Sequence, residues 1–316
     1  MNTRPQYDPT KRQDSALEVT RAQMQGLALV ALESAILTHG LTRPHNLVFA
    51  QDMEQAVRDE GAVPATVGVL EGKIMVGMSQ VDLERLAYAD APLKVSPRNF
   101  AAALLQQSSG GTTLAGTMLA ASQKGIKVLA AGGIGGVQVE QRFDVSSDLK
   151  ALAETPMVVV CSGALGVLDI AATAEYLETM GVQVIGYQTD KFPEFFLPGK
   201  DIQVNIRLDT IEEIAKLIGY HWGLGLQSAV LVCQPIAASA ALERKETEAA
   251  ISQASKDALK QGVRGQNLTP FLLKRVSDLT NGKSMRANLT LSLNNAKLAA
   301  QIARVLSGVE RNPNVV

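Results

Sequence analysis

The sequence predicts an α/β domain with a mixed central sheet and a helical layer near the C-terminus. Short apolar runs alternate with longer segments of helical apolar spacing, which is the pattern of α/β architecture. Two of the apolar runs are joined only by Glu71 and Gly72, as in a β-hairpin, so the sheet should be mixed rather than purely parallel. After Pro235 the pattern becomes strongly helical.

Six apolar runs are predicted to be buried strands: 27–32, 65–70, 127–131, 157–161, 183–187 and 229–233. The run at 73–78 should complete the hairpin. Helical spacing covers 47–60, 113–124, 167–180 and 210–218, and glycine follows each of these segments at or near its end, as expected of a C-cap. The C-terminal layer should contain helices at 243–260, 270–280 and 294–306.

Composition limits the kind of partner. With 316 residues, 46% of them hydrophobic, the chain can form one large domain or two closely packed ones. A net charge of -1 and the lack of a long basic run argue against nucleic-acid binding and favour a small-molecule substrate. The polar start of the chain and the absence of a membrane-length apolar run indicate a cytoplasmic protein with no membrane partner. Cys161 and Cys233 each end an apolar run, so they should be buried thiols rather than a disulfide.

Glu33 is the first candidate for chemistry. It follows the 27–32 run, so its carboxyl should lie at the C-terminal edge of a strand, where open α/β sheets bind ligands. Position alone favours a surface or helix-capping glutamate, and a chemical role therefore requires a partner group.

Two glycine-rich segments are candidate ligand-binding turns. Gly110-Gly111-Thr112-Thr113 precedes a helical pattern and offers N–H groups and hydroxyls to an anion such as phosphate, although it lacks the Gly-Lys-Ser/Thr of a P-loop. The run 132–136 follows a strand, but Gln138 stands where the dinucleotide fingerprint needs glycine. We therefore expect close backbone approach there, without a Rossmann cofactor.

The acidic and basic candidates remain open on the residues alone. Asp144 and Asp148, with Ser146 and Ser147 between them, fit either a capped helix start or a site for Mg²⁺ or Mn²⁺. Lys94 fits a solvated charge, an anion contact or an amine nucleophile.

Several motifs, in order and spacing, resemble the pseudouridine-5'-phosphate glycosidases, the indigoidine-synthase-A-like family. The motifs are Ala31-Leu32-Glu33-Ser34, Thr38-His39-Gly40, Gly61-Ala62-Val63-Pro64-Ala65-Thr66, Lys94-Val95-Ser96, Gly132-Gly133-Ile134-Gly135-Gly136-Val137, Thr269-Pro270-Phe271 and Asn294-Asn295-Ala296. The resemblance implies a three-layer α/β/α domain over residues 26–307, leaving a polar extension at 1–25 and a tail at 308–316.

The resemblance also implies an activity and its residues. The family reversibly cleaves the carbon–carbon glycosidic bond of pseudouridine 5'-phosphate to uracil and ribose 5-phosphate, as a homotrimer with one divalent cation, typically Mn²⁺, per subunit. It implies that Glu33 is the proton donor and Asp144 the metal ligand. Residues implied to contact the substrate are Lys94, Thr112, Leu114, Ser146, Ser147, Asp148 and Asn288.

Two departures concern the chemistry. The family carries a Schiff-base lysine where this chain has Leu165, and a histidine where it has Gln138. Leucine cannot form an iminium, so the chain either turns over weakly or uses another amine, Lys94 or Lys191. The alternatives are a non-catalytic paralogue that binds a sugar phosphate or nucleotide, and an enzyme that ribosylates a different aromatic carbon.

Overall fold

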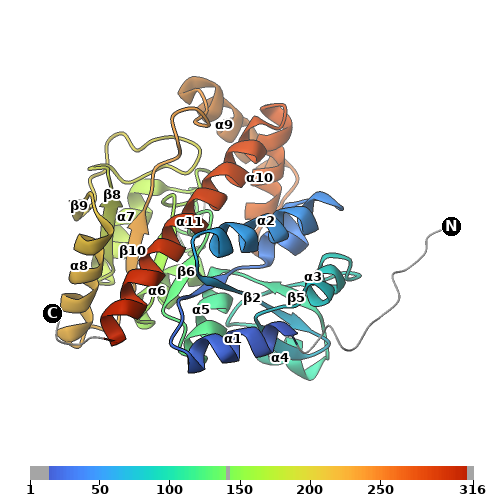
Figure 1. Ribbon diagram of the computed structural model, residues 1–316. Coiled ribbons are helices and arrows are strands. Elements are labelled where there is room, and N and C mark those ends of the chain that lie inside the picture. Colours follow the sequence, from blue (N-terminus) through green and yellow to red (C-terminus); the bar gives the residue numbers. More distant parts are fainter. Residues whose placement is uncertain (1–13, 140–142, 312–316) are drawn as a thin grey trace.

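The computed structural model describes residues 14–139 and 143–311, which form a mixed sheet between two helical layers (Figure 1). The strands are β1 (Leu29–Leu32), β2 (Val63–Leu70), β3 (Lys73–Val76), β4 (Leu93–Val95), β5 (Gly110–Thr112), β6 (Val128–Ala130), β7 (Val158–Cys161), β8 (Gln183–Tyr187), β9 (Ile206–Leu208) and β10 (Val230–Cys233). Their order across the sheet is β4-β5-β2-β1-β6-β7-β10-β8-β9, with β3 paired to β2.

The α/β class and the mixed sheet are confirmed, and all six predicted strands are present. Strands β2, β1, β6, β7, β10, β8 and β9 are parallel neighbours, whereas β2 pairs antiparallel with β3 and β5. The β2–β3 hairpin turns at Glu71 and Gly72, both at positive φ. The sequence did not predict β4, β5 and β9, each of which is only three residues long.

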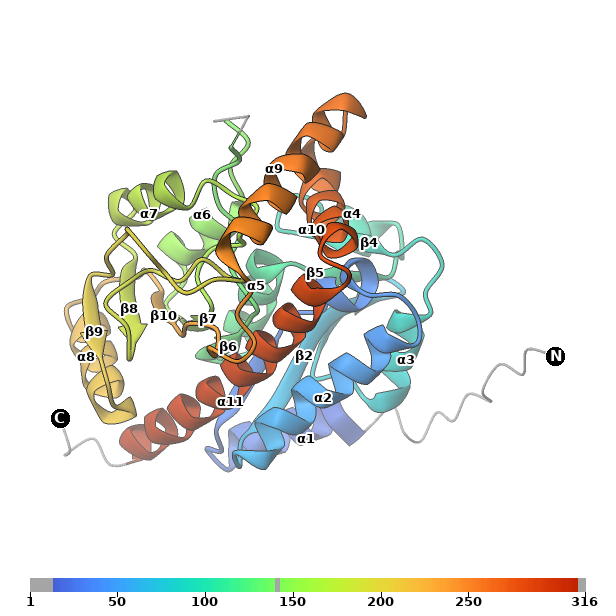
Figure 2. The same cartoon turned by 90° about the horizontal axis from the view of Figure 1, so that it is seen from above.

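The helices are α1 (Asp14–Met24), α2 (His45–Asp59), α3 (Gln80–Ala87), α4 (Phe100–Leu105), α5 (Leu114–Gln123), α6 (Ser147–Glu154), α7 (Ile170–Thr179), α8 (Ile211–Gly223), α9 (Arg244–Lys260), α10 (Leu268–Leu279) and α11 (Lys283–Arg311). A π-helix, η2 (Ile36–Gly40), and a 3-10 turn, η3 (Gly265–Asn267), complete the described elements. Helices α2, α8 and α11 pack on one face of the sheet and α1, α4, α5, α6 and α7 on the other. Figure 2 shows α11 running beside α2 along its face.

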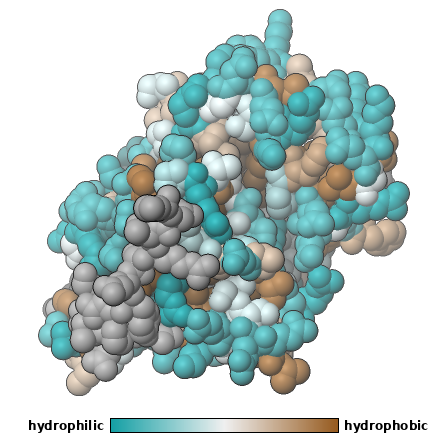
Figure 3. All heavy atoms as spheres, turned by 90° about the vertical axis from the view of Figure 1, so that its right-hand side faces the viewer, coloured by the Kyte–Doolittle hydropathy of each residue, from teal (hydrophilic) through white to brown (hydrophobic). Residues whose placement is uncertain are grey.

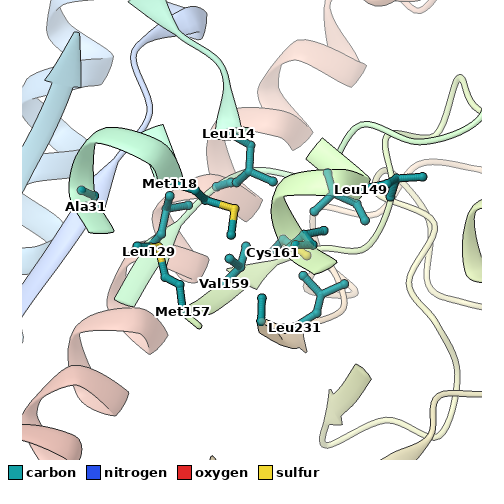
Figure 4. Close-up of a cluster of buried hydrophobic side chains, with 14 of the residues drawn as sticks. Ala31, Leu114, Met118, Leu129, Leu149, Met157, Val159, Cys161 and Leu231 are labelled. Atoms are coloured by element: carbon teal, nitrogen blue, oxygen red, sulfur yellow. The ribbon is translucent and has the colours of Figure 1, made fainter. Parts of the chain in front are cut away.

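Burial of apolar side chains holds the layers together. Neighbouring strands present Ala31, Leu129, Val159 and Leu231 to the same face, where they join Met118 of α5 in one cluster (Figure 4). Full burial of a side chain of leucine or methionine size contributes about 1.5–3 kcal/mol. The face shown in Figure 3 is mainly hydrophilic, with scattered hydrophobic side chains. Within the residues described, no helix is long and apolar enough to span a bilayer.

The two ends of the chain differ from the expected boundaries. Helix α1 falls within the expected extension at 1–25, yet its Val19 and Ala22 are only 3% and 1% exposed and pack on the sheet layer. Helix α11 continues through the expected boundary at 308. Residues 1–13 and 312–316 lie outside the described structure, so the proposed boundaries themselves stay predictions. Both cysteines are buried free thiols, as expected.

Candidate active site

The carboxyl ends of β1, β6 and β7 lie side by side, and each leads into a segment that the sequence marked as a candidate. Glu33 follows β1, the glycine turn 132–136 follows β6, and Leu165 lies four residues after β7. The chain passes from β1 to β2 on one side and returns to β6 on the other, so the sheet has a topological switch point here. A cavity of about 1160 Å³ opens at this edge.

Strand length explains how distant segments reach the same edge. Leu32 of β1 pairs with Thr66, so the last four residues of β2 project beyond β1. Strand β5 pairs antiparallel with this projecting part, and its chain runs back toward the end of β1. The start of α5 at Leu114 thereby lines the same cavity as Glu33, and β4 runs parallel beside β5.

The structure brings nearly all the predicted site residues to this cavity. Those that line it are Glu33, Lys94, Leu114, Asp144, Ser146, Ser147, Asp148, Leu165 and Asn288. Their elements are separated by as many as 255 residues of sequence, from Glu33 to Asn288, and the sheet edge accounts for their meeting.

Thr112 is the exception. It is completely buried, and it does not line the cavity. Its hydroxyl donates to the carbonyl of Val67 at 2.8 Å and lies 2.8 Å from the hydroxyl of Thr117, while its N–H donates to the hydroxyl of Ser34. Thr112 therefore fastens β5 to β2 and β1 beneath the cavity, and the adjacent Thr113 lines the wall instead.

Glu33 is suited to donate a proton. Its burial raises the pKa to about 8, the Asp148 carboxylate adds to this increase, and the Lys94 ammonium opposes it. A carboxyl with this pKa is mostly protonated at neutral pH, and general acids work best when their pKa lies near the working pH. Lys94 also lies near His39, where its charge, second to burial of the ring, lowers the pKa of that imidazole.

The glycine turn is a place of close approach rather than a cofactor motif. A Cβ on Gly133 would lie 2.8 Å from the ring of Phe195, and one on Gly135 would lie 2.8 Å from Oδ2 of Asp148. Glycine is required at both positions because any side chain would displace the groups that form the wall. The expected close backbone approach is therefore confirmed, and the neighbours are the protein's own side chains.

The opposite wall of the cavity is apolar. Leu165 packs in one cluster with Leu168 and Phe195, and its backbone N–H donates to the carbonyl of Ile134 in the glycine turn at 3.0 Å. Gln138 lines the same end, where its amide donates to the hydroxyl of Thr269 at the start of α10. Neither side chain can supply an amine or an imidazole to a ligand.

One buried amide fastens the strand ends together. Asn295 of α11 is fully buried, and its side-chain NH₂ donates to the carbonyls of Ala131 and Gly132 and to the hydroxyl of Ser162. The first two partners follow β6 and the third follows β7. The glycine turn and the Leu165 segment are thus held by the same residue.

The residues present offer limited ligation to a metal ion. Across residues 14–139 and 143–311, no three His, Cys, Asp or Glu side chains come close enough to hold one together. Both carboxylate oxygens of Asp148 accept backbone N–H groups, while Asp144 offers a further carboxylate at the cavity wall, as does Asp278. Such a donor fits a hard cation that keeps most of its water ligands, as Mg²⁺ does.

The sequence reasoning missed several lining residues. Arg98 follows the Lys94 motif closely, so its proximity could have suggested it. Lys274 and Arg286 enter from α10 and α11, and Phe195 from an irregular loop at positive φ. These three could not have been assigned, because their positions depend on long-range packing of the C-terminal helices and of a loop without periodicity.

Comparisons with known proteins agree on one family. Residues 18–305 match the family described as indigoidine synthase A like protein. The chain is 46% identical over 292 residues to the pseudouridine-5'-phosphate glycosidase of Geobacillus kaustophilus, covering 92% of this chain and 97% of that relative. It is also 46% identical, over 293 residues, to pseudouridine-5'-phosphate glycosidase 2 of Photorhabdus laumondii, covering 92% of this chain and 94% of that relative.

Two solved structures share the fold. The prealnumycin C-glycosynthase AlnA, solved in complex with ribulose 5-phosphate, superimposes with a TM-score of 0.85 at 36% identity, covering 93% of this chain and 96% of that chain. An indigoidine synthase A-like protein from Thermotoga maritima gives a TM-score of 0.84 at 32% identity, covering 90% of this chain and 94% of that chain. The chain belongs to the indigoidine synthase A-like family.

Proposed function

We propose that this protein makes and breaks the carbon–carbon glycosidic bond of pseudouridine 5'-phosphate. In the cleavage direction the bond between C1 of the ribose and C5 of uracil breaks, a proton is added to C5, and water completes the aldehyde of ribose 5-phosphate. The observation that carries the proposal is Glu33, a protonated carboxyl at the carboxyl edge of the sheet, in a chain whose relatives are named for this reaction.

The cavity supports a division of roles. Glu33 donates the proton to the sugar or the base. Ser146, Ser147 and Asn288, which line the cavity, are proposed to contact the sugar phosphate, and Leu114 to shape the pocket. A hydrogen bond from a neutral donor contributes about 0.5–1.5 kcal/mol and one to a charged group about 1.5–3 kcal/mol, so several such contacts suffice for binding at metabolite concentrations.

Lys94 is the proposed amine in place of the lysine absent at position 165. Lys94 lines the cavity and its charge acts on Glu33, whereas Lys191, the other candidate from the sequence, does not line the cavity. The neutral Lys94 amine would add to C1 of the sugar and open the ring, whose oxygen takes a proton. As the bond to uracil breaks, its electron pair goes to C5, which takes a proton, and the nitrogen lone pair forms an iminium at C1. Water then hydrolyses this iminium, which releases the sugar aldehyde and the free amine.

Three finer expectations belong to the same proposal. Mn²⁺ would be held by Asp144 together with water and substrate oxygens, where its charge would help to bind the phosphorylated sugar. The protein would act as a homotrimer in the cytoplasm. All three rest on family resemblance.

The test is a product assay with two proteins. The native protein and the Leu165→Lys variant are incubated with uracil and ribose 5-phosphate, with and without Mn²⁺, and pseudouridine 5'-phosphate is measured by mass spectrometry. Product from the native protein is the expected result. If only the variant forms product, the native protein is not a glycosidase and the proposal fails.

Borohydride trapping tests the amine. Reduction in the presence of ribose 5-phosphate should attach the sugar irreversibly to Lys94, and peptide mapping identifies the modified residue. Lys94→Met should abolish the adduct, while Lys191→Met should leave it unchanged. Product without an adduct at Lys94 would refute this assignment but leave the reaction itself in place.

The apolar wall around Leu165 favours a second candidate, a non-catalytic protein that binds a sugar phosphate. Such a protein should be stabilised by ribose 5-phosphate in a thermal shift assay, since ligands that bind only the folded state raise its apparent stability. It should form no product under any condition of the assay above.

A further inference from the structure

The carboxylate of Asp148 lies where three segments of the site meet. Its Oδ1 accepts the N–H of Ala115 at 3.0 Å, and its Oδ2 accepts the N–H of Gly135 at 2.9 Å. Its own backbone N–H donates to the hydroxyl of Ser146 at 3.2 Å. The residue is 7% exposed, so these bonds are made largely out of contact with water.

The bond to Ala115 uses a group that would otherwise attract a ligand. The first N–H groups of a helix lack partners within the helix and carry the positive end of its dipole, so they bind anions. In α5 the N–H of Ala115 is taken by Asp148, and that of Gly116 by the hydroxyl of Thr113. The anion at this helix start is supplied by the protein itself.

The bond to Gly135 fixes the glycine turn. A Cβ at position 135 would lie 2.8 Å from Oδ2 of Asp148, so the backbone approaches the carboxylate more closely than any other residue type allows. The same carboxylate therefore holds α6, α5 and the turn after β6 in one arrangement.

The charge of Asp148 faces the proton donor. After burial, it is the strongest influence that raises the pKa of Glu33, and the Lys94 ammonium acts in the opposite direction. Two backbone N–H groups bind the carboxylate of Asp148, so it is held in one position beside the Glu33 carboxyl.

We propose that Asp148 is a positioning residue, which ties α5 to the glycine turn and holds a negative charge against Glu33. This inference rests on the proposed role of Glu33 as proton donor. The two carboxylate oxygens of Asp148 accept backbone N–H groups from two different elements, a role that holds whether or not a substrate is bound.

The test follows the titration of Glu33 directly and needs no turnover. Protein labelled with ¹³C at the glutamate carboxyls is titrated by NMR, and the Glu33 signal is assigned by its loss in Glu33→Gln. Asp148→Asn should lower the pKa of Glu33 below its value of about 8, and Lys94→Met should raise it above that value. Asp144→Asn in metal-free buffer removes a carboxylate from the same cavity and should leave the titration unchanged.

Kinetics separate positioning from binding. In Asp148→Asn the alkaline fall of kcat/KM should begin at lower pH, with kcat reduced several-fold at pH 8 and KM for ribose 5-phosphate changed less than two-fold. An unchanged Glu33 titration together with a large rise in KM would overturn the inference and make Asp148 a substrate ligand.

A second variant covers the case in which Asp148→Asn does not fold. In Asp148→Asn the new side-chain NH₂ group can face the backbone N–H groups, which are also donors. Asp148→Ser removes the charge too, but its hydroxyl is smaller than an NH₂ group and competes less with those donors. Asp148→Ser should shift the Glu33 titration in the same direction. If the native protein forms no product but both variants shift the Glu33 titration, the proposed reaction fails while the role of Asp148 stands.

Discussion

The two walls of the cavity differ in how they are built. The wall that carries Glu33 is charged and closely hydrogen-bonded, with Lys94 and Asp148 acting on the same carboxyl. The opposite wall presents Leu165 beside Phe195 and is held by apolar packing and by backbone hydrogen bonds, among them one from the N–H of Leu165 to the carbonyl of Ile134. The wall with Glu33 depends on residues from several elements. The wall with Leu165 can change its chemistry through a substitution at that one position.

This difference separates two tasks that the proposed reaction requires. Proton transfer needs a carboxyl whose environment keeps it neutral, and that environment cannot be assembled by one substitution. Covalent capture of the sugar needs one amine, and a lysine at another position of the sequence can supply it. In the proposed mechanism, leucine at position 165 leaves the first task intact and the second is assigned to Lys94.

The largest effect should come from the donor wall. Glu33→Gln removes the transferable proton but keeps the shape, so product formation should fall by about 10²–10⁴-fold, the usual contribution of general acid catalysis. Leu165→Met, a matched change in the opposite wall, should alter the rate by less than about ten-fold because it preserves size and apolarity. Equal losses in the two variants would show that the walls are not functionally distinct.

The next effect concerns stability. Asn295→Ala removes the donors for the carbonyls of Ala131 and Gly132, which are left buried without that partner. Each unsatisfied buried group costs about 1–3 kcal/mol, so the free energy of unfolding should fall by roughly 2–5 kcal/mol in urea denaturation. Asn288→Ala, on the same helix but at the cavity surface, is the control and should cost about 1 kcal/mol or less. A loss of similar size in both would mean that Asn295 is not the fastening point.

The third effect is a dependence of stability on pH. Burial raises the pKa of Glu33 to about 8 and that of Glu54 to about 7, both from 4.5, and the Glu54 carboxyl accepts a hydrogen bond from Thr66 beneath the cavity. The folded state then binds more protons than the unfolded state between pH 4.5 and 8, so stability is highest below this window and is lost as pH rises through it.

Two neutral variants should flatten that dependence. Glu33→Gln and Glu54→Gln cannot ionise, so each should lose less stability than the native protein between pH 5 and 9, measured by urea denaturation at several pH values. Glu178→Gln, on the surface of α7, should behave like the native protein. If all four proteins gave the same slope, burial of these carboxyls would not control their protonation.

The sequence was most informative where local patterns decide the structure. Six of the seven strands in the parallel part of the sheet follow from apolar runs, and the hairpin follows from Glu71 and Gly72. The sequence did not reveal that Thr112 lies outside the cavity lining, because residues 110–112 form a short strand whose pairing with β2 is a tertiary contact. The candidate site was found mainly through motifs, whereas the hydrogen bonds of Asp148 and the placement of Phe195 depend on folding at long range.

Asn295 has a consequence for how this scaffold can diversify. Its amide holds the segments after β6 and β7 through their backbone carbonyls and one serine hydroxyl, without reference to the side chain at position 165. Substitutions in the Leu165 segment can therefore be tried without losing the shape of the cavity. A side chain with an amine, another apolar side chain or a site for a different aromatic acceptor could be introduced there. This segment is therefore the natural place to begin redesigning the protein for new carbon–carbon bonds.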